Sequence, residues 1–218
     1  MDDHECIAAD IRHFIRCSGH SRNIEPNEFV FHEGQAGDSL YLIDKGRVVV
    51  QRRTPLGDVA TLTVLGRDDM FGEMALLGDR HRTATVRTLE PCRFHILDRA
   101  KFDELRRLQP TAGLAFEQML AEMVRRLSDR LVEALFEDAR VRLARRLVEL
   151  ASMYSADESG GFIPLTQEMI GSMAGVKLRQ TAKRLQEFDE QKLIRLERSR
   201  IFITNLARLR QKGRLIDR

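Results

Sequence analysis

The sequence has 218 residues, of which 43% are hydrophobic and 32% charged, a composition typical of a soluble globular protein with room for two modest domains. No apolar run approaches the ~20 residues that a membrane helix needs. The polar start at residues 1–5 is unlike a signal peptide, so we expect a cytoplasmic protein without a membrane partner. Cys6, Cys17 and Cys92 are too widely spaced for a disulfide framework or a zinc site.

The formal net charge of +3 conceals an asymmetry along the chain. Residues 138–218 contain 17 Lys and Arg against 10 Asp and Glu, whereas the remainder contains 19 against 23. A basic C-terminal part joined to a mildly acidic N-terminal part indicates that only the C-terminal part meets a polyanion. Charge alone does not identify DNA as that polyanion, because many solvated helices are equally basic.

Short runs of strand-forming residues, broken by glycine, extend from Phe29 to about Leu97. The predicted strands are residues 29–31, 40–43, 47–51, 59–64, 84–89 and 92–97. We expect Gly34, Gly37 and Gly46 to occupy tight turns that need a positive φ, and residues 55–58 to form a hairpin loop. This pattern predicts a compact antiparallel roll or sandwich, and it leaves the segment before Phe29 without a prediction.

The segment from Phe71 to Val86 carries the most informative motif of the chain. Gly72 lets the backbone approach a ligand, and the free N–H groups of the helical turn that follows attract an anion. Arg82 can bind a phosphate in bidentate fashion, and Glu73 can accept a hydrogen bond from a ribose hydroxyl. Either residue alone is more often a helix acid or a solvated charge. Together, in this order and spacing, they predict a sugar-phosphate site.

Beyond Pro110 the pattern changes to that of a long helix. Its apolar residues recur at alternating steps of four and three, at Leu120, Val124, Leu127, Leu131 and Ala134. This pattern predicts an apolar seam of the kind found in coiled coils. The alternative is a helix that only packs on its own roll, since two heptads do not make an isolated coiled coil secure.

The C-terminal part has the pattern of a winged helix-turn-helix. An amphipathic helix at 139–153 is followed by a loop at 155–161 and a short strand that reaches Leu165. Thr166 is a candidate N-cap for a helix at 167–173, and Ala174 and Gly175 end that helix. A second helix is expected at 177–188, with one face made of Leu178, Thr181, Leu185 and Phe188.

Cationic and amide side chains elsewhere on the second helix are free to enter a major groove, where arginine and lysine bind guanine and glutamine pairs with adenine. Residues 194–204, with Arg195 among them, would form a wing whose basic turn contacts phosphate. The expected DNA-binding residues are Thr166, Gln167, Lys177, Arg179, Gln180, Lys183, Arg198 and Arg200.

The segment from Phe71 to Val86 resembles the phosphate-binding cassette of cyclic-nucleotide-binding domains. The resemblance implies that Glu73 holds the ribose 2′-hydroxyl, while Arg82 and Thr83 hold the cyclic phosphate. The nucleotide-binding residues that it implies are Phe71, Gly72, Glu73, Met74, Ala75, Arg82, Thr83 and Ala84.

The cassette, the heptad helix and the winged helix-turn-helix, in this order, resemble the cyclic-AMP receptor protein family of bacterial transcription regulators. The resemblance implies an α+β fold with a jelly-roll-like β-roll at 1–110, a dimerisation helix and hinge at 111–137, and a winged helix-turn-helix domain at 138–218. It implies a homodimeric regulator rather than an enzyme. The expected ligand is cAMP, with cGMP still open, and the expected partners are a pseudo-palindromic DNA operator and RNA polymerase.

Two departures from the family pattern limit what the resemblance implies. The usual Ser-Arg-Glu opening of the recognition helix is replaced by residues 177–179, and its later arginine by Lys183, so the family's usual operator does not carry over. The long helix is about one turn shorter near residues 127–135. Ser128, with Arg130 behind it, is therefore the candidate contact for the base of the nucleotide.

Two alternatives stay open. The chain could bind DNA without a ligand, or with a redox or gas signal and a vestigial nucleotide pocket, although three scattered thiols cannot supply the four ligands of a usual iron–sulfur cluster. It could also be a metal enzyme of the cupin type. His32, His81 and His95 lack the close His-x-His grouping plus acid that such a site needs, so we expect no metal and no catalytic residues.

Overall fold

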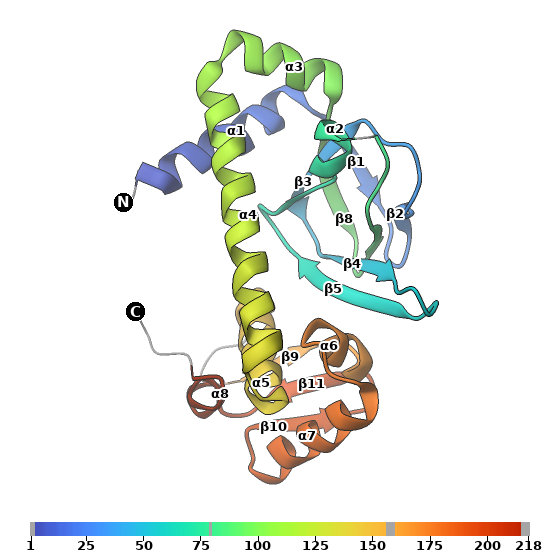
Figure 1. Ribbon diagram of the computed structural model, residues 1–218, viewed down its shortest axis with the longest axis vertical. Helices are drawn as coiled ribbons and strands as arrows, with labels where there is room; N and C mark the ends of the chain where they lie inside the picture. The colour runs from blue at the N-terminus through green and yellow to red at the C-terminus, as the bar shows by residue number, and fades with distance from the viewer. Residues whose placement is uncertain (1–2, 79, 156–159, 215–218) are drawn as a thin grey trace. The chain divides into compact units, whose positions relative to one another are not determined.

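The computed structural model describes residues 3–78, 80–155 and 160–214 and divides into two compact units, Met1–Leu127 and Ser128–Arg218 (Figure 1). Helix α4 (Pro110–Phe136) belongs to both units, and it begins and ends within a residue of the predicted dimerisation helix. The predicted three-part division of the chain stays a prediction. Among the described residues, no helix is both long and apolar enough to span a bilayer.

The N-terminal unit is built on two antiparallel four-stranded sheets, which confirms the predicted β-roll. The first sheet has the order β1 (His20–Ile24), β8 (Cys92–Asp98), β3 (Ser39–Lys45) and β6 (Met70–Phe71). The second has the order β2 (Phe29–Phe31), β7 (Thr85–Thr88), β4 (Val48–Arg53) and β5 (Val59–Leu65). The short helix α2 (Glu73–Leu77) follows β6, and α3 (Arg99–Leu108) follows β8.

Aromatic rings fill the core of the roll. The rings of Tyr41 and Phe71 stack with their centroids 5.0 Å apart, and Phe94 meets them edge-on at 6.1 and 5.7 Å. Phe31 packs against Tyr41 and Phe71 from the second sheet, at 5.7 and 5.8 Å. These offset and edge-to-face contacts fix β6, and therefore the start of the cassette that follows it, against the core.

Several local features were missed or wrongly predicted from the sequence. Helix α1 (Asp3–Ser18) occupies the segment left without a prediction, and it fully buries Ile11 and Ile15, four residues apart on one face. Gly34 and Gly46 have the expected positive φ, at 83° and 90°. The prediction for Gly37 was wrong, because this glycine is needed for space: a Cβ atom there would lie 2.2 Å from Nε of Arg82.

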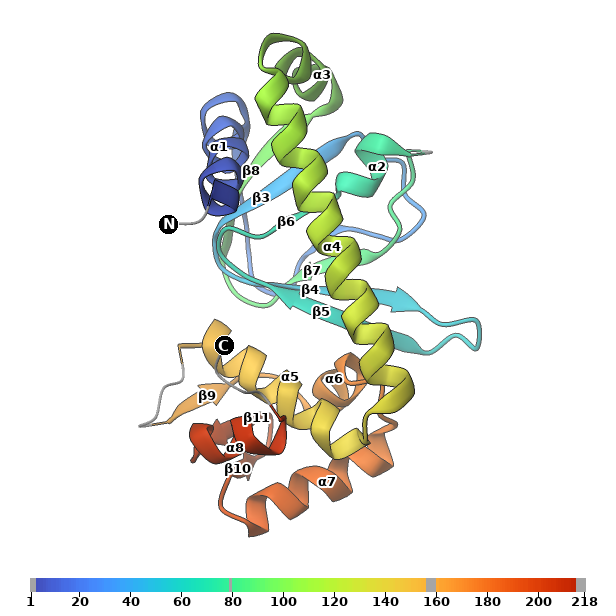
Figure 2. The same ribbon diagram turned by 60° about the vertical axis from the view of Figure 1, so that its left-hand side comes forward.

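The described residues of the C-terminal unit form a small antiparallel sheet together with the end of α4 and the helices that follow it. Its sheet has the order β10 (Ile194–Glu197), β11 (Arg200–Ile203) and β9 (Gly161–Ile163). Its helices after α4 are α5 (Ala139–Met153), α6 (Gln167–Met173), α7 (Leu178–Glu190) and α8 (Leu206–Lys212). Helix α5 packs on α8, and α6 packs on α7 (Figure 2).

Arg142 of α5 joins two turns of this unit. Its guanidinium group donates to the carbonyl oxygens of Ala134 and Glu137 at 3.0 Å each, at the end of α4. It also donates to the carbonyl oxygens of Ala174 and Gly175, at 2.9 and 3.2 Å, just after α6. These are the carbonyls that a helix end leaves without an intrahelical partner, so one side chain caps two helices.

The pair α6 and α7 forms the predicted helix-turn-helix. Thr166 caps α6 as expected, since its hydroxyl accepts a hydrogen bond from the backbone nitrogen of Met169 at 3.2 Å. Helix α7 begins one residue later than predicted and extends to Glu190. The prediction that Leu178 lies on the buried face was wrong: as the first residue of α7 it is 54% exposed, and the buried face begins at Thr181.

Replacement of Gly171 by alanine is expected to destabilise the C-terminal unit. The added Cβ atom would lie 2.2 Å from the hydroxyl of Thr181, which is fully buried and donates to the carbonyls of Val176 and Lys177. Such overpacking costs about 1–3 kcal/mol. The matched control is Gly113→Ala in α4, where the nearest atom is 3.9 Å away and alanine favours the helix. Thermal denaturation of both variants measures the difference in stability. If Gly171→Ala is as stable as Gly113→Ala, the packing argument is wrong.

Candidate functional site

A cavity opens in the β-roll beside the cassette. It holds about 570 Å³ of space free of protein atoms, open solvent included. Its lining residues are Phe31, Val50, Thr63, Leu65, Met70, Phe71, Gly72, Glu73, Met74, Ala75, Arg82, Thr83, Ala84, Val86 and Met123. The structure therefore brings the eight predicted cassette residues together around one cavity.

Arg82 is the charged centre of this cavity. Its Nη1 atom donates to the carbonyl oxygens of Ser39 and Gly72, at 2.8 and 3.1 Å, and its Nη2 atom donates to the hydroxyl of Ser39 at 2.9 Å. The guanidinium carbon lies 4.3 Å from the centroid of the Phe31 ring. Arg82 is only 4% exposed, and burial lowers its pKa. The carboxylates of Asp38 and Glu73 are close enough to oppose this effect of burial on the pKa, but among the described residues no carboxylate forms an ion pair with Arg82.

Gly72 gives Arg82 the room to lie there. Its φ of 89° falls in the left-handed region, and an added Cβ atom would lie 2.7 Å from Nη1 of Arg82 and 2.9 Å from the carbonyl oxygen of Ser39. The backbone conformation and the space both exclude a side chain at this position. The glycine that the motif predicted is thus explained by the packing of the arginine.

Glu73 supplies the acid of the site. It is the first residue of α2 and is 7% exposed, and burial raises its pKa above the ordinary value, an effect that a hydrogen bond from its own backbone N–H and the nearby charge of Arg82 partly oppose. A buried carboxylate remains costly unless its other lone pairs also find donors. The geometry therefore suits a ligand that brings a hydroxyl donor to Glu73 and an anion to Arg82.

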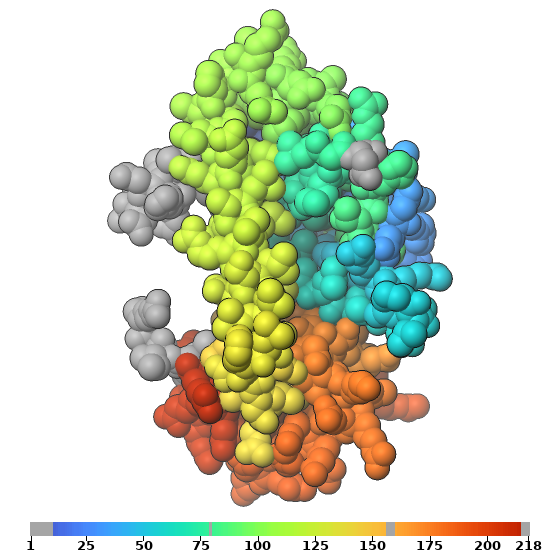
Figure 3. Space-filling view, in the orientation of Figure 1, coloured from blue at the N-terminus to red at the C-terminus, as the bar shows by residue number. Residues whose placement is uncertain are grey.

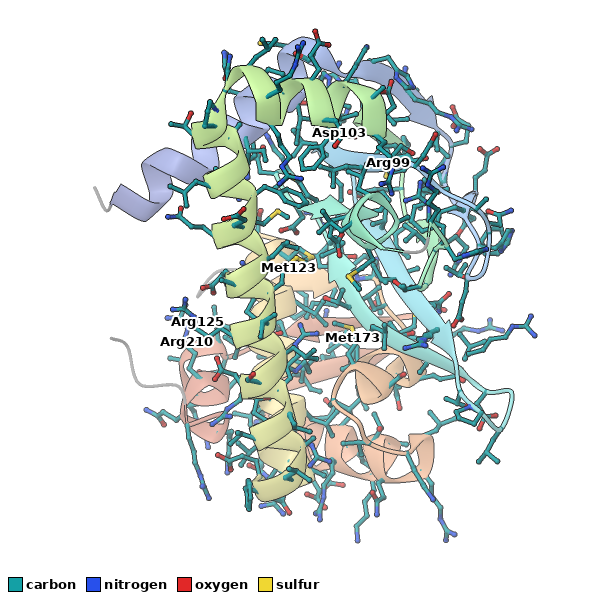
Figure 4. The ribbon with its side chains drawn as sticks, turned by 45° about the horizontal axis from the view of Figure 1, so that its top comes forward. Arg99, Asp103, Met123, Arg125, Met173 and Arg210 are labelled. Atoms are coloured by element: carbon teal, nitrogen blue, oxygen red, sulfur yellow. The ribbon has the colours of Figure 1, made fainter. Side chains whose placement is uncertain are left out.

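Other lining residues of the cavity come from elements that the motif did not indicate. Val50, Thr63 and Leu65 come from β4 and β5, and Met123 comes from α4, where its side chain lies on the side that faces the roll (Figure 4). Met123 was missed, although its position three residues after Leu120 places it at the edge of the seam. Ser128 is exposed and is not among the described lining residues, and its role stays a prediction.

The seam of α4 is largely open to solvent. Val124, Leu127 and Leu131 are 63%, 68% and 59% exposed, and Leu135 and Phe136 continue the exposed apolar side of the helix. Figure 3 shows this helix, in yellow-green, uncovered in the view drawn. A row of large apolar side chains on a surface typically marks a protein interface.

The recognition helix presents the predicted side chains. Lys177, Arg179, Gln180 and Lys183 are all exposed, at or near the start of α7, while Leu185 and Phe188 on the other face are fully buried. Thr166 is exposed and Gln167 is half-buried at the start of α6. The helix thus divides into an anchoring face and a cationic face, as the sequence predicted.

In the wing, by contrast, two of the predicted cations are already engaged. Glu197 pairs with Arg195 at 3.1 Å and with Arg200 at 2.6 Å, and these two hydrogen bonds lower the pKa of Glu197. Arg195 and Arg200 also stack on the rings of Phe202 and Phe162, at 4.7 and 4.1 Å. Glu197 was missed from the sequence, although it directly opposes Arg200 in the predicted hairpin. Arg198, at the turn, is exposed.

Comparison with known proteins agrees with these two units. Residues 21–108 match the family described as the cyclic nucleotide-binding domain, and residues 141–212 match the Crp-like helix-turn-helix domain. A "CRP-like cAMP-activated global transcriptional regulator" of Mycobacterium tuberculosis is 31% identical over 202 residues, which cover 89% of this chain and 90% of the relative. The chain belongs to the CRP family of transcription regulators.

Other members of the CRP family share its fold but differ in the signal that their names state. The "Cyclic AMP receptor protein" of Thermus thermophilus is 27% identical, with 84% of this chain and 82% of the relative covered. The solved structure of the c-di-GMP responsive global regulator CLP from Xanthomonas campestris has a TM-score of 0.74 at 19% identity and covers 90% of this chain and 98% of its own. Membership of the family therefore shows that this chain is a DNA-binding transcription regulator, but it does not identify the ligand. The ligand has to be inferred from the residues of the cavity.

Replacement of Glu73 by glutamine is expected to stabilise the ligand-free regulator at neutral pH. Because the pKa of Glu73 is raised in the native state, the ionised carboxyl costs stability, and this cost appears as the pH rises from the ordinary pKa, about 4.3, through the native one. The variant should melt at a higher temperature than the wild type at pH 7, and the difference should vanish toward pH 4. The control is Glu104→Gln, at an exposed position on α3. A lower melting temperature for Glu73→Gln at pH 7 would contradict this account.

Proposed function

We propose that this regulator is a cAMP-responsive homodimer that binds an operator of double-stranded DNA. The observation that carries the proposal is the buried guanidinium group of Arg82, which has no carboxylate partner among the described residues and lines the same cavity as Glu73. A cation in an apolar setting favours an anionic ligand. The names of the relatives from Mycobacterium tuberculosis and Pasteurella multocida, both "cAMP-activated", support cAMP as that ligand.

A cyclic mononucleotide fits the order of groups around the cavity. The phosphate would accept hydrogen bonds from Arg82 and Thr83, and the ribose 2′-hydroxyl would donate to Glu73. The base would then contact the lining that Met123 and the strands β4 and β5 contribute. Arg82 is the one cationic side chain among the described lining residues, which favours a single phosphate over the two of a cyclic dinucleotide.

The DNA-binding part of the proposal rests on the C-terminal unit. The exposed cations of α7 would read base edges in a major groove, and Arg198 would contact phosphate. The exposed apolar side of α4 would pair with that of a second copy, and the two-fold axis would place both recognition helices on a pseudo-palindromic operator. Linkage then requires that cAMP and DNA strengthen each other's binding by the same factor.

Calorimetry with cAMP and with cGMP tests the ligand. We expect heat of binding with cAMP, and a loss of about 100-fold in affinity for Arg82→Gln, because the phosphate loses its charged donor. Arg22→Gln, an exposed position on β1, is the matched control and should bind as the wild type does. If the folded wild type gives no heat with either nucleotide, the cavity does not serve this ligand.

The recognition helix can be tested by base-by-base DNA selection. Lys183→Gln is expected to change the preferred base at one position of each half-site, at a cost of about 1–3 kcal/mol for the original operator. The control is Lys192→Gln, which removes the same charge just after α7 and should weaken binding without changing the preference. An unchanged preference in Lys183→Gln would show that the assigned face of α7 does not read bases.

The wing gives a further prediction about DNA affinity. Glu197→Gln should release Arg195 and Arg200 to contact phosphate, so DNA binding should strengthen. One or two additional phosphate contacts should also steepen the plot of log binding constant against log salt concentration, by a slope of about −0.9 for each contact. Glu104→Gln makes the same change of net charge on α3 and serves as the control. Gel-shift titrations at several salt concentrations measure both quantities, and an unchanged slope in Glu197→Gln would refute the release of the two arginines.

A further inference from the structure

The cassette helix α2 depends on the residues around it for its position. It has only five residues, too few to form a helix that is stable by itself. Two arginines from other parts of the chain donate to its backbone carbonyls. Arg82 donates to the carbonyl of Gly72 at 3.1 Å, just before α2, and Nη2 of Arg99 donates to the carbonyl of Ala75 at 2.8 Å, within it.

The two arginines are themselves tied to neighbouring residues. The backbone nitrogen of Arg99 donates to the carbonyl of Asp38 at 2.8 Å, and the next residue, Ser39, accepts both Nη1 and Nη2 of Arg82. A closed circuit of hydrogen bonds and main chain therefore runs from Gly72 through Arg82, residues 38–39 and Arg99 back to α2. The two arginines thus hold α2 at its start and at its middle, and both are anchored at residues 38–39, where β3 begins.

Arg99 also links the cassette to the other wall of the cavity. It is the first residue of α3, marked in Figure 4, and α3 is followed after Gln109 by α4, which contributes Met123 to the lining. Its Nε atom is buried without a hydrogen-bond partner in the part of the chain that the structure describes. Such a buried donor lowers stability, so the side chain is not explained as a purely stabilising one.

We propose that Arg99 is a positioning residue for nucleotide binding. It holds α2 through the carbonyl of Ala75, so that Glu73, two residues earlier in this helix, faces the ribose while Arg82 faces the phosphate. This inference rests on the proposed function of the cavity. Arg99 does not touch the ligand in this assignment, and it acts through the position of α2.

The test compares Arg99→Met with Arg107→Met. Methionine keeps the aliphatic stem and removes the donors, and Arg107 is an exposed arginine on the same helix. We expect the cAMP concentration for half-maximal DNA binding to rise about tenfold in Arg99→Met, the effect of one charge-assisted hydrogen bond, with DNA affinity at saturating cAMP unchanged. Arg107→Met should match the wild type in both measurements. Arg99→Gln replaces Arg99→Met if the latter does not fold.

Hydrogen exchange without nucleotide provides the second measurement. The amides of α2 should exchange faster in Arg99→Met than in the wild type, while those of β3 and β8 keep their protection. The proposal is overturned if Arg99→Met needs the same cAMP concentration as the wild type for half-maximal DNA binding. It is also overturned if DNA affinity at saturating cAMP falls by as much as the half-maximal concentration rises. If the wild type does not bind cAMP, the proposed function fails, and the exchange of the α2 amides still decides whether Arg99 holds the helix.

Discussion

The buried guanidinium group of Arg82 is the interaction on which the candidate nucleotide site depends. It bonds to Ser39 and to the backbone at Gly72, and it lies on the ring of Phe31. These contacts fix its direction but leave its charge without a carboxylate partner among the described residues. The aromatic core, the positive φ of Gly72 and the missing side chain at Gly37 all serve to place this one group. A preorganised cation of this kind binds an anion without first giving up another ion pair.

The sequence predicted the parts of the site that are close together in the chain, and it missed those that strand pairing brings in. Glu73 and Arg82 could be assigned because one short motif contains both. Ser39 and Phe31 come from strands more than thirty residues earlier, and neither has a pattern that singles it out. Met123 reaches the cavity from α4, whose periodicity indicated only a seam. Local spacing predicts local chemistry, whereas contacts between distant segments depend on how the strands pair and in which register.

The same limit applies to the C-terminal unit. Both helices of the helix-turn-helix were predicted within two residues, because caps and breakers are local signals. Leu178 was assigned to the same face as Thr181, Leu185 and Phe188, and its position at the first turn leaves it exposed. In the wing, counting arginines overestimated the free positive charge, since Glu197 holds two of them. Net charge therefore describes the unit as a whole better than it describes any one contact with DNA.

Arg142 has a consequence for how relatives of this chain can differ in length. The guanidinium group of Arg142 caps both the end of α4 and the turn after α6. An insertion in one of these segments would move the side chain and leave carbonyls of the other segment without a donor. The lengths of the two segments are therefore coupled. Gains and losses of residues among related chains should accumulate in the hairpin tips of the roll and be rare at this junction.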